Sequence, residues 1–149
     1  MRLLRIFALL LFLAGVLGGR AADKPASEAP VAAVKAFIIA LAERDEAKIR
    51  SSALPNPHLA SLWTDPLSAE DKASLLRIAQ DELRVLKAGE TIPMEGGFLT
   101  VPPQPAKGGT ALVYGDSMLY PLPVQRVNGA WKVNPGPMLA GREKAKKGK

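Results

Sequence analysis

The dipeptide Asn128-Gly129 is the feature that most constrains the fold of this 149-residue chain. It separates two short runs of strand-type residues, and Asn-Gly is typical of a two-residue type I′ hairpin, in which both turn residues adopt positive φ. Such a turn sets the register, so that Arg126 lies opposite Trp131 and Val124 lies opposite Val133. Because side chains alternate along a strand, these four residues share one face of the predicted antiparallel hairpin.

Helical patterns occupy the part of the chain before this hairpin. Pro30 suits the first turn of a helix, and apolar residues follow at helical spacing over residues 31–41. Asp45 is placed to cap a second, shorter helix that begins at Glu46. The tripeptide Pro55-Asn56-Pro57 then prevents further helix.

A third helix is predicted after Ser68, which can cap it together with Asp71 in a capping-box-like arrangement. The sequence does not fix where this helix ends, because the pattern of residues 84–86 is equally typical of a continued helix and of a first strand. Strand-type runs separated by Gly, Pro and Asp follow at residues 98–101, 110–114, 118–127 and 130–133. Helices followed by an antiparallel sheet with one apolar face predict an α+β domain.

Two of these segments also resemble a known family. The helix pattern PVAAVKAFIIALAERD and the hairpin PLPVQRVNGAWKVNPGP are similar to the first helix and the last strand pair of small exported members of the nuclear transport factor 2-like superfamily. The order of elements agrees over about residues 30–137. This resemblance implies a ketosteroid-isomerase-like, cystatin-like cone, in which the N-terminal helices pack on a curved antiparallel sheet around a pocket. It also implies a homodimer formed through the outer face of the sheet.

The first 21 residues have the pattern of a signal peptide. Arg2 and Arg5 precede an apolar run over residues 6–16, which has the length of a signal-peptide core and is short of the roughly 20 residues of a membrane span. We expect cleavage after Ala21 and a location in the bacterial periplasm or outside the cell. The alternative is an uncleaved membrane anchor; after cleavage no stable membrane span is expected.

Cleavage would leave a polar linker at residues 22–29, one α+β domain at residues 30–141 and a basic tail at residues 142–149, which we predict to be disordered. The chain has no cysteine, which excludes lipid attachment at the cleavage site, thiol chemistry and zinc sites of the cysteine type. The net charge of +6 arises from the two ends, and the body between them is close to neutral. This distribution argues against a nucleic-acid-binding protein.

Four side chains are candidates for binding a ligand. Arg126 faces Trp131 on the predicted hairpin, where it would anchor an anionic group if this face lines a pocket. The alternative is that its aliphatic stem covers the sheet edge. Tyr114 and Tyr120 flank the predicted turn after the strand at residues 110–114. The pocket that the resemblance implies, together with the lack of an acid/base set, predicts a non-catalytic domain that binds a small molecule or an envelope protein.

An isomerase- or hydratase-like enzyme is the alternative. Its acid or base would have to be Tyr114, Asp116 or His58, which is the chain's single histidine. We predict no catalytic residue among them, because Asp116 lies in a turn sequence and His58 follows a proline in a loop. The sequence contains no phosphate-binding glycine loop or HExxH pair, and we expect neither a cofactor nor a metal.

Overall fold

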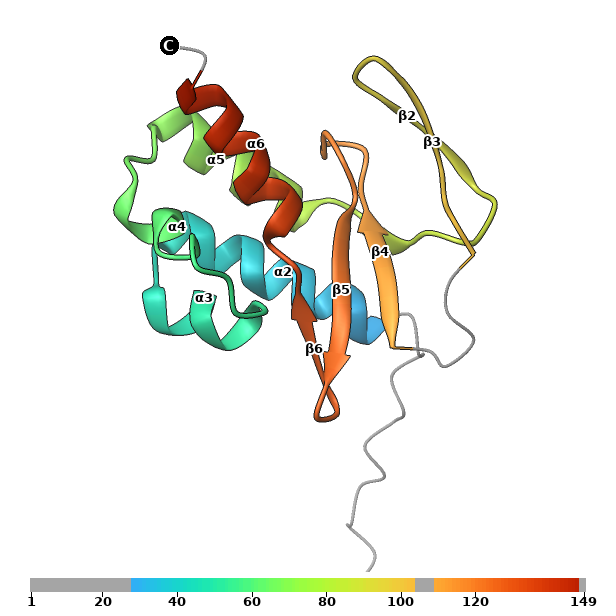
Figure 1. Ribbon diagram of the computed structural model, residues 1–149, viewed down its shortest axis with the longest axis horizontal. Helices are drawn as coiled ribbons and strands as arrows, with labels where there is room; N and C mark the ends of the chain where they lie inside the picture. Colours follow the sequence, from blue (N-terminus) through green and yellow to red (C-terminus); the bar gives the residue numbers. More distant parts are fainter. Residues whose placement is uncertain (1–27, 104–108, 148–149) are drawn as a thin grey trace, which may run out of the picture.

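The computed structural model of this protein describes residues 28–103 and 109–147 (Figure 1). The predicted signal peptide at residues 1–21 and the linker as far as residue 27 lie outside the described residues. The elements in chain order are α2 (Glu28–Glu43), α3 (Glu46–Ser52), α4 (Ser61–Thr64), α5 (Ala69–Gln80), β1 (Arg84–Val85), β2 (Thr91–Met94), β3 (Gly97–Thr100), β4 (Thr110–Tyr114), β5 (Leu122–Val127), β6 (Ala130–Val133) and α6 (Gly136–Lys147).

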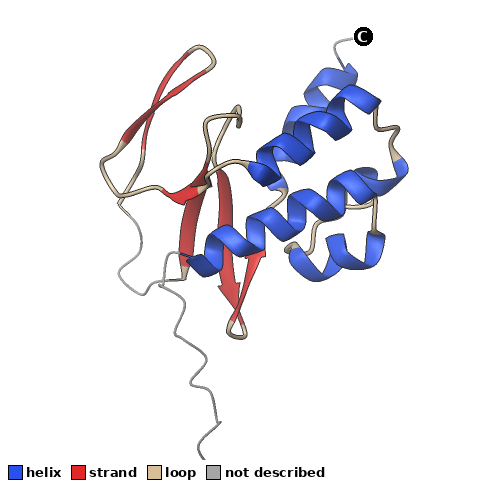
Figure 2. Ribbon diagram, turned by 180° about the vertical axis from the view of Figure 1, so that it is seen from behind, coloured by secondary structure: helices blue, strands red, loops and turns tan. Residues whose placement is uncertain are grey.

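The predicted α+β class is confirmed. Strands β1, β4, β5 and β6 form one antiparallel sheet in that order, and β2 and β3 form a separate two-stranded hairpin. Figure 2 shows α2 lying across one face of the larger sheet, with the other helices gathered beyond one side of it. In the residues that the structure describes, no helix is long and apolar enough to cross a membrane.

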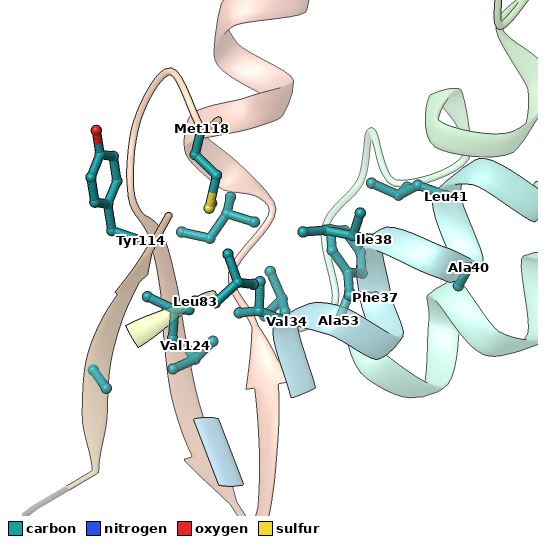
Figure 3. Close-up of a cluster of buried hydrophobic side chains, with 14 of the residues drawn as sticks. Val34, Phe37, Ile38, Ala40, Leu41, Ala53, Leu83, Tyr114, Met118 and Val124 are labelled. Atoms are coloured by element: carbon teal, nitrogen blue, oxygen red, sulfur yellow. The ribbon is translucent and has the colours of Figure 1, made fainter. Parts of the chain in front are cut away.

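The core is built around α2. Val34, Phe37, Ile38 and Leu41 recur at helical spacing on one side of this helix, and all four are buried (Figure 3). They meet buried side chains of the sheet, such as Val124. Because one stripe of α2 supplies so much of this core, its apolar face determines which face of the sheet is covered.

The hairpin of β5 and β6 has the predicted register. Arg126 pairs with Trp131 and Val124 pairs with Val133. The turn residues Asn128 and Gly129 have φ values of 50° and 80°, as a type I′ turn requires. Trp131 packs against the core but is only partly buried, because Trp131 and its partner Arg126 lie near the turn of the hairpin.

Both predicted helix caps are also confirmed. The carboxylate of Asp45 accepts the backbone N–H of Lys48 at 3.1 Å. The hydroxyl of Ser68 accepts the backbone N–H of Asp71 at 3.0 Å. Helix α5 ends at Gln80, and residues 84 and 85 pair with β4 as strand β1, so the strand interpretation of this segment is right.

Two sheet predictions need correction. Residues 118–121 form a loop before β5 rather than the start of a strand, and β2 was not predicted. Pro93 makes β2 difficult to predict from the sequence, because proline cannot donate a backbone hydrogen bond and is rare in interior strands. In the structure β2 lies at a sheet edge, where proline is tolerated.

The two ends of the domain also differ from the predicted boundaries. Helix α2 begins at Glu28, two residues before Pro30. Helix α6 continues through Lys147, so residues 142–147 are helical where the sequence predicted a disordered tail. The buried side chain of Leu139 docks the start of this helix, and side chains of its later turns contact the segment around α4.

Candidate functional site

The four predicted ligand-binding residues do not form one site. Tyr114 ends β4 and Tyr120 lies in the loop that leads to β5, at one end of the larger sheet. Arg126 and Trp131 lie next to the β5–β6 turn, at the other end of β5 (Figure 1). The length of β5 therefore separates the two pairs.

The hairpin pair has the predicted placement. Arg126 is exposed, and Trp131 opposite it is partly buried. The cation–π contact in the described part of the chain joins other residues: the Arg50 guanidinium lies 4.6 Å from the ring centre of Trp63. The Arg44 guanidinium donates hydrogen bonds to the backbone carbonyl of the same residue, Trp63.

Of the other pair, Tyr120 lies near Arg142 of α6. Tyr114 is buried in the core, and Figure 3 shows its hydroxyl pointing away from the labelled side chains of α2. Tyr120 is half-buried, and this burial raises the pKa of its phenol, an effect that the nearby Arg142 guanidinium opposes. Asp116, in the turn between the two tyrosines, is exposed as the sequence predicted.

His58 lies in the turn before α4, and its side chain contacts α6 rather than the tyrosine pair. Its Nδ1 atom is 3.2 Å from Oε1 of Glu143, and both side chains are about half exposed to solvent. Beside it, Nη1 of Arg142 donates to the carbonyl oxygen of Ser61 at 3.4 Å. The Ser61 hydroxyl donates to the backbone carbonyl of His58 at 2.9 Å, so it is not aligned with the imidazole as a nucleophile would be.

We call the side chains around α6 the loop–α6 surface. It consists of Leu119 and Tyr120 from the β4–β5 loop, Arg142 and Glu143 from α6, and His58. The Leu119 side chain is 71% exposed, and the loop lies alongside α6 in Figures 1 and 2. An exposed apolar side chain next to an amphipathic phenol and a guanidinium is suited to hold a partner by contact and by charge, since Tyr and Arg are enriched at protein interfaces.

Sequence reasoning missed three members of this surface. Arg142 and Glu143 were assigned to the disordered tail, and Leu119 was assigned to a strand. The apolar pair Met138-Leu139 followed by Arg142 and Glu143, at one-turn spacing, was a helical signal that could have identified α6. Among the described residues, no group of three His, Cys, Asp or Glu side chains could hold a metal ion.

No protein-family model, curated protein or solved structure matches this chain. Membership of the nuclear transport factor 2-like superfamily therefore stays a prediction.

Proposed function

We propose that this protein is an exported, non-catalytic binding domain and that it binds another protein of the cell envelope at the loop–α6 surface. The observation that carries the proposal is the 71% exposure of Leu119 beside the half-buried Tyr120. Burying a leucine side chain contributes about 1.5–3 kcal/mol, so a partner that covers Leu119 would gain free energy of this order.

The partner that fits this surface carries an apolar side chain flanked by a carboxylate. The apolar group would pack on Leu119 and on the ring of Tyr120. The carboxylate would meet Arg142, whose guanidinium is held at the surface by the Ser61 carbonyl. Charge-assisted bonds of guanidinium to carboxylate are the stronger kind of hydrogen bond, so Arg142 would select the orientation of the partner.

The enzyme alternative receives less support from these contacts. Proton transfer needs an acid or base within hydrogen-bond reach of the reacting atom, usually inside a site that excludes water. The His58 ring and Asp116 are exposed, and the imidazole faces Glu143 instead of either tyrosine. Small-molecule binding in a cystatin-like cone with a curved sheet, as the resemblance implies, is a further proposal that the α+β architecture permits.

Export is the second part of the proposal, and it rests on the charged start and short apolar run of residues 1–21. Intact-mass measurement of the protein from the periplasmic fraction tests it. We expect a mature N-terminus at Ala22. Recovery of the full-length chain as an integral membrane protein would contradict export as a cleaved protein.

Site-specific photo-crosslinking in living cells tests the binding surface. A photoreactive amino acid at position 119 should give a discrete adduct with one envelope protein. The matched control places the same amino acid at the exposed position 125, in the middle of β5. Absence of an adduct at position 119, or the same adduct at both positions, would refute the proposal.

A further inference from the structure

The β2–β3 hairpin carries a sheet edge that lacks the usual protection. In the described part of the chain, the edge at β6 is covered, because the backbone N–H of Leu54 donates to the carbonyl of Val133 at 2.8 Å. The opposite edge, β1, is only two residues long. On the hairpin, the β2 edge contains Pro93, which cannot donate a hydrogen bond. Strand β3 has none of these features.

The register of the hairpin shows which backbone groups β3 presents. The N–H of Val101 donates to the carbonyl of Glu90 at 2.8 Å, which makes this pair a hydrogen-bonded one. Hydrogen-bonded and non-hydrogen-bonded pairs alternate along an antiparallel ladder. The pairs of Thr100 with Thr91 and of Phe98 with Pro93 are therefore of the second kind. The N–H and C=O groups of Phe98 and Thr100 point away from β2.

The side chains of β3 make this edge apolar and uncharged. Its sequence is Gly97-Phe98-Leu99-Thr100, without the lysine that often protects an edge. Phe98 is 80% exposed on the outer face of the hairpin, which stands out from the body in Figures 1 and 2. Leu99 points to the other face and packs against the core.

We infer that the β3 edge pairs with the β3 edge of a second copy of this chain, independently of the proposed function. The edge is self-complementary when the β3 strands of two copies pair antiparallel, with Leu99 of one copy opposite Leu99 of the other. Phe98 of each copy then lies opposite Thr100 of the other, and the outward groups of both residues form four inter-chain hydrogen bonds. The two Phe98 rings become diagonal neighbours, a separation that aromatic side chains can bridge. The absence of charge on β3 removes the repulsion that two identical charged edges would meet.

Proline substitution tests this pairing. Thr100→Pro removes an outward N–H that the hairpin itself does not use, and with it two of the four inter-chain bonds. We expect the dissociation constant of the dimer, measured by sedimentation velocity, to rise about tenfold or more. The matched control is Thr91→Pro, which removes the outward N–H of the directly opposite residue on β2 and breaks the same hydroxyl contact between the two threonines. It should leave the dimer intact, and circular dichroism should show that both variants fold.

Disulfide trapping tests the register. The chain has no cysteine, so Leu99→Cys introduces a single thiol. In the inferred dimer the two Leu99 Cα atoms lie about 4.5 Å apart, within the range that a disulfide spans. Oxidation should therefore link Leu99→Cys chains into covalent dimers and leave Thr91→Cys chains unlinked. A protein that stays monomeric at all concentrations, or a dimer that Thr100→Pro does not weaken and Leu99→Cys does not trap, would overturn the inference.

Discussion

At the scale of single residues, burial separates two aromatic side chains that the sequence makes equally prominent. Phe37 is fully buried in the centre of α2, whereas Trp131 is only partly buried near a hairpin turn. Phe37→Ala should lower the free energy of unfolding by about 3–5 kcal/mol, the usual cost of emptying a buried aromatic site.

Trp131→Ala should lower the free energy of unfolding clearly less than Phe37→Ala does, because a smaller part of the indole is buried in the core. Urea unfolding of both variants measures the two free energies. An equal loss in both would show that Trp131 is a core residue despite its partial exposure.

The capping carboxylate of Asp45 should make stability depend on pH. The backbone N–H of Lys48 and its ammonium group hold the pKa of this carboxyl below its ordinary value. A depressed pKa means that the contribution is present above the unfolded-state pKa, near pH 4, and is lost as the pH falls through the folded-state value.

Asp45→Asn keeps an acceptor for the Lys48 N–H but cannot titrate. We expect its urea midpoint to fall less steeply than that of the natural protein between about pH 5 and pH 2. Identical slopes for the two proteins would mean that the Asp45 contact does not contribute to the loss of stability in acid.

At the scale of elements, α6 should be held by its first turns. Leu139 is buried, whereas the contacts of Arg142 and Glu143 lie at the surface. Leu139→Ala should therefore lower the free energy of unfolding by about 2–5 kcal/mol. Removing residues 142–149 should cost less than about 1 kcal/mol, because exposed ion pairs contribute little.

Thermal and urea unfolding of these two proteins measure the difference. Loss of more stability from the truncation than from Leu139→Ala would show that the basic end of α6 is a structural part of the domain. Far-ultraviolet circular dichroism of the truncated chain reports whether the rest of α6 remains helical.

Elements with local signals were the ones that the sequence predicted best. The Asn128-Gly129 turn and the Asp45 and Ser68 caps act over two to four residues, so their consequences can be read from neighbouring positions. Strand β2 and helix α6 depend on distant contacts. Pro93 is acceptable only because β2 lies at an edge, and α6 is held by Leu139, which packs in the same core cluster as side chains of distant elements.

The candidate site could not be predicted for the same reason. Tyr120 was identified from the sequence, but the nearby Arg142 lies on α6, a helix that the sequence did not predict. Arg126 and Trp131 were correctly paired by the hairpin register, yet the register could not show that β5 carries them away from the tyrosines. Local pattern therefore gave the register, and tertiary packing decided which side chains share a surface.

At the scale of the whole molecule, two surfaces of different character lie outside the core. The loop–α6 surface combines Leu119 and Tyr120 with charged groups of α6, whereas the β3 edge is uncharged backbone with one exposed ring. Charge favours a distinct partner at the first surface, because complementary charges suppress wrong partners. Self-complementary geometry favours a second copy at the other.

The affinity of the envelope protein captured at position 119 for purified variants tests the proposed function most directly. Leu119→Ala should raise the Kd at least about tenfold, because the partner can no longer bury that side chain. Phe98→Ala, which truncates the other strongly exposed apolar side chain, should change the Kd less than about twofold. An unchanged Kd for Leu119→Ala, or equal losses for both variants, would contradict binding at the loop–α6 surface.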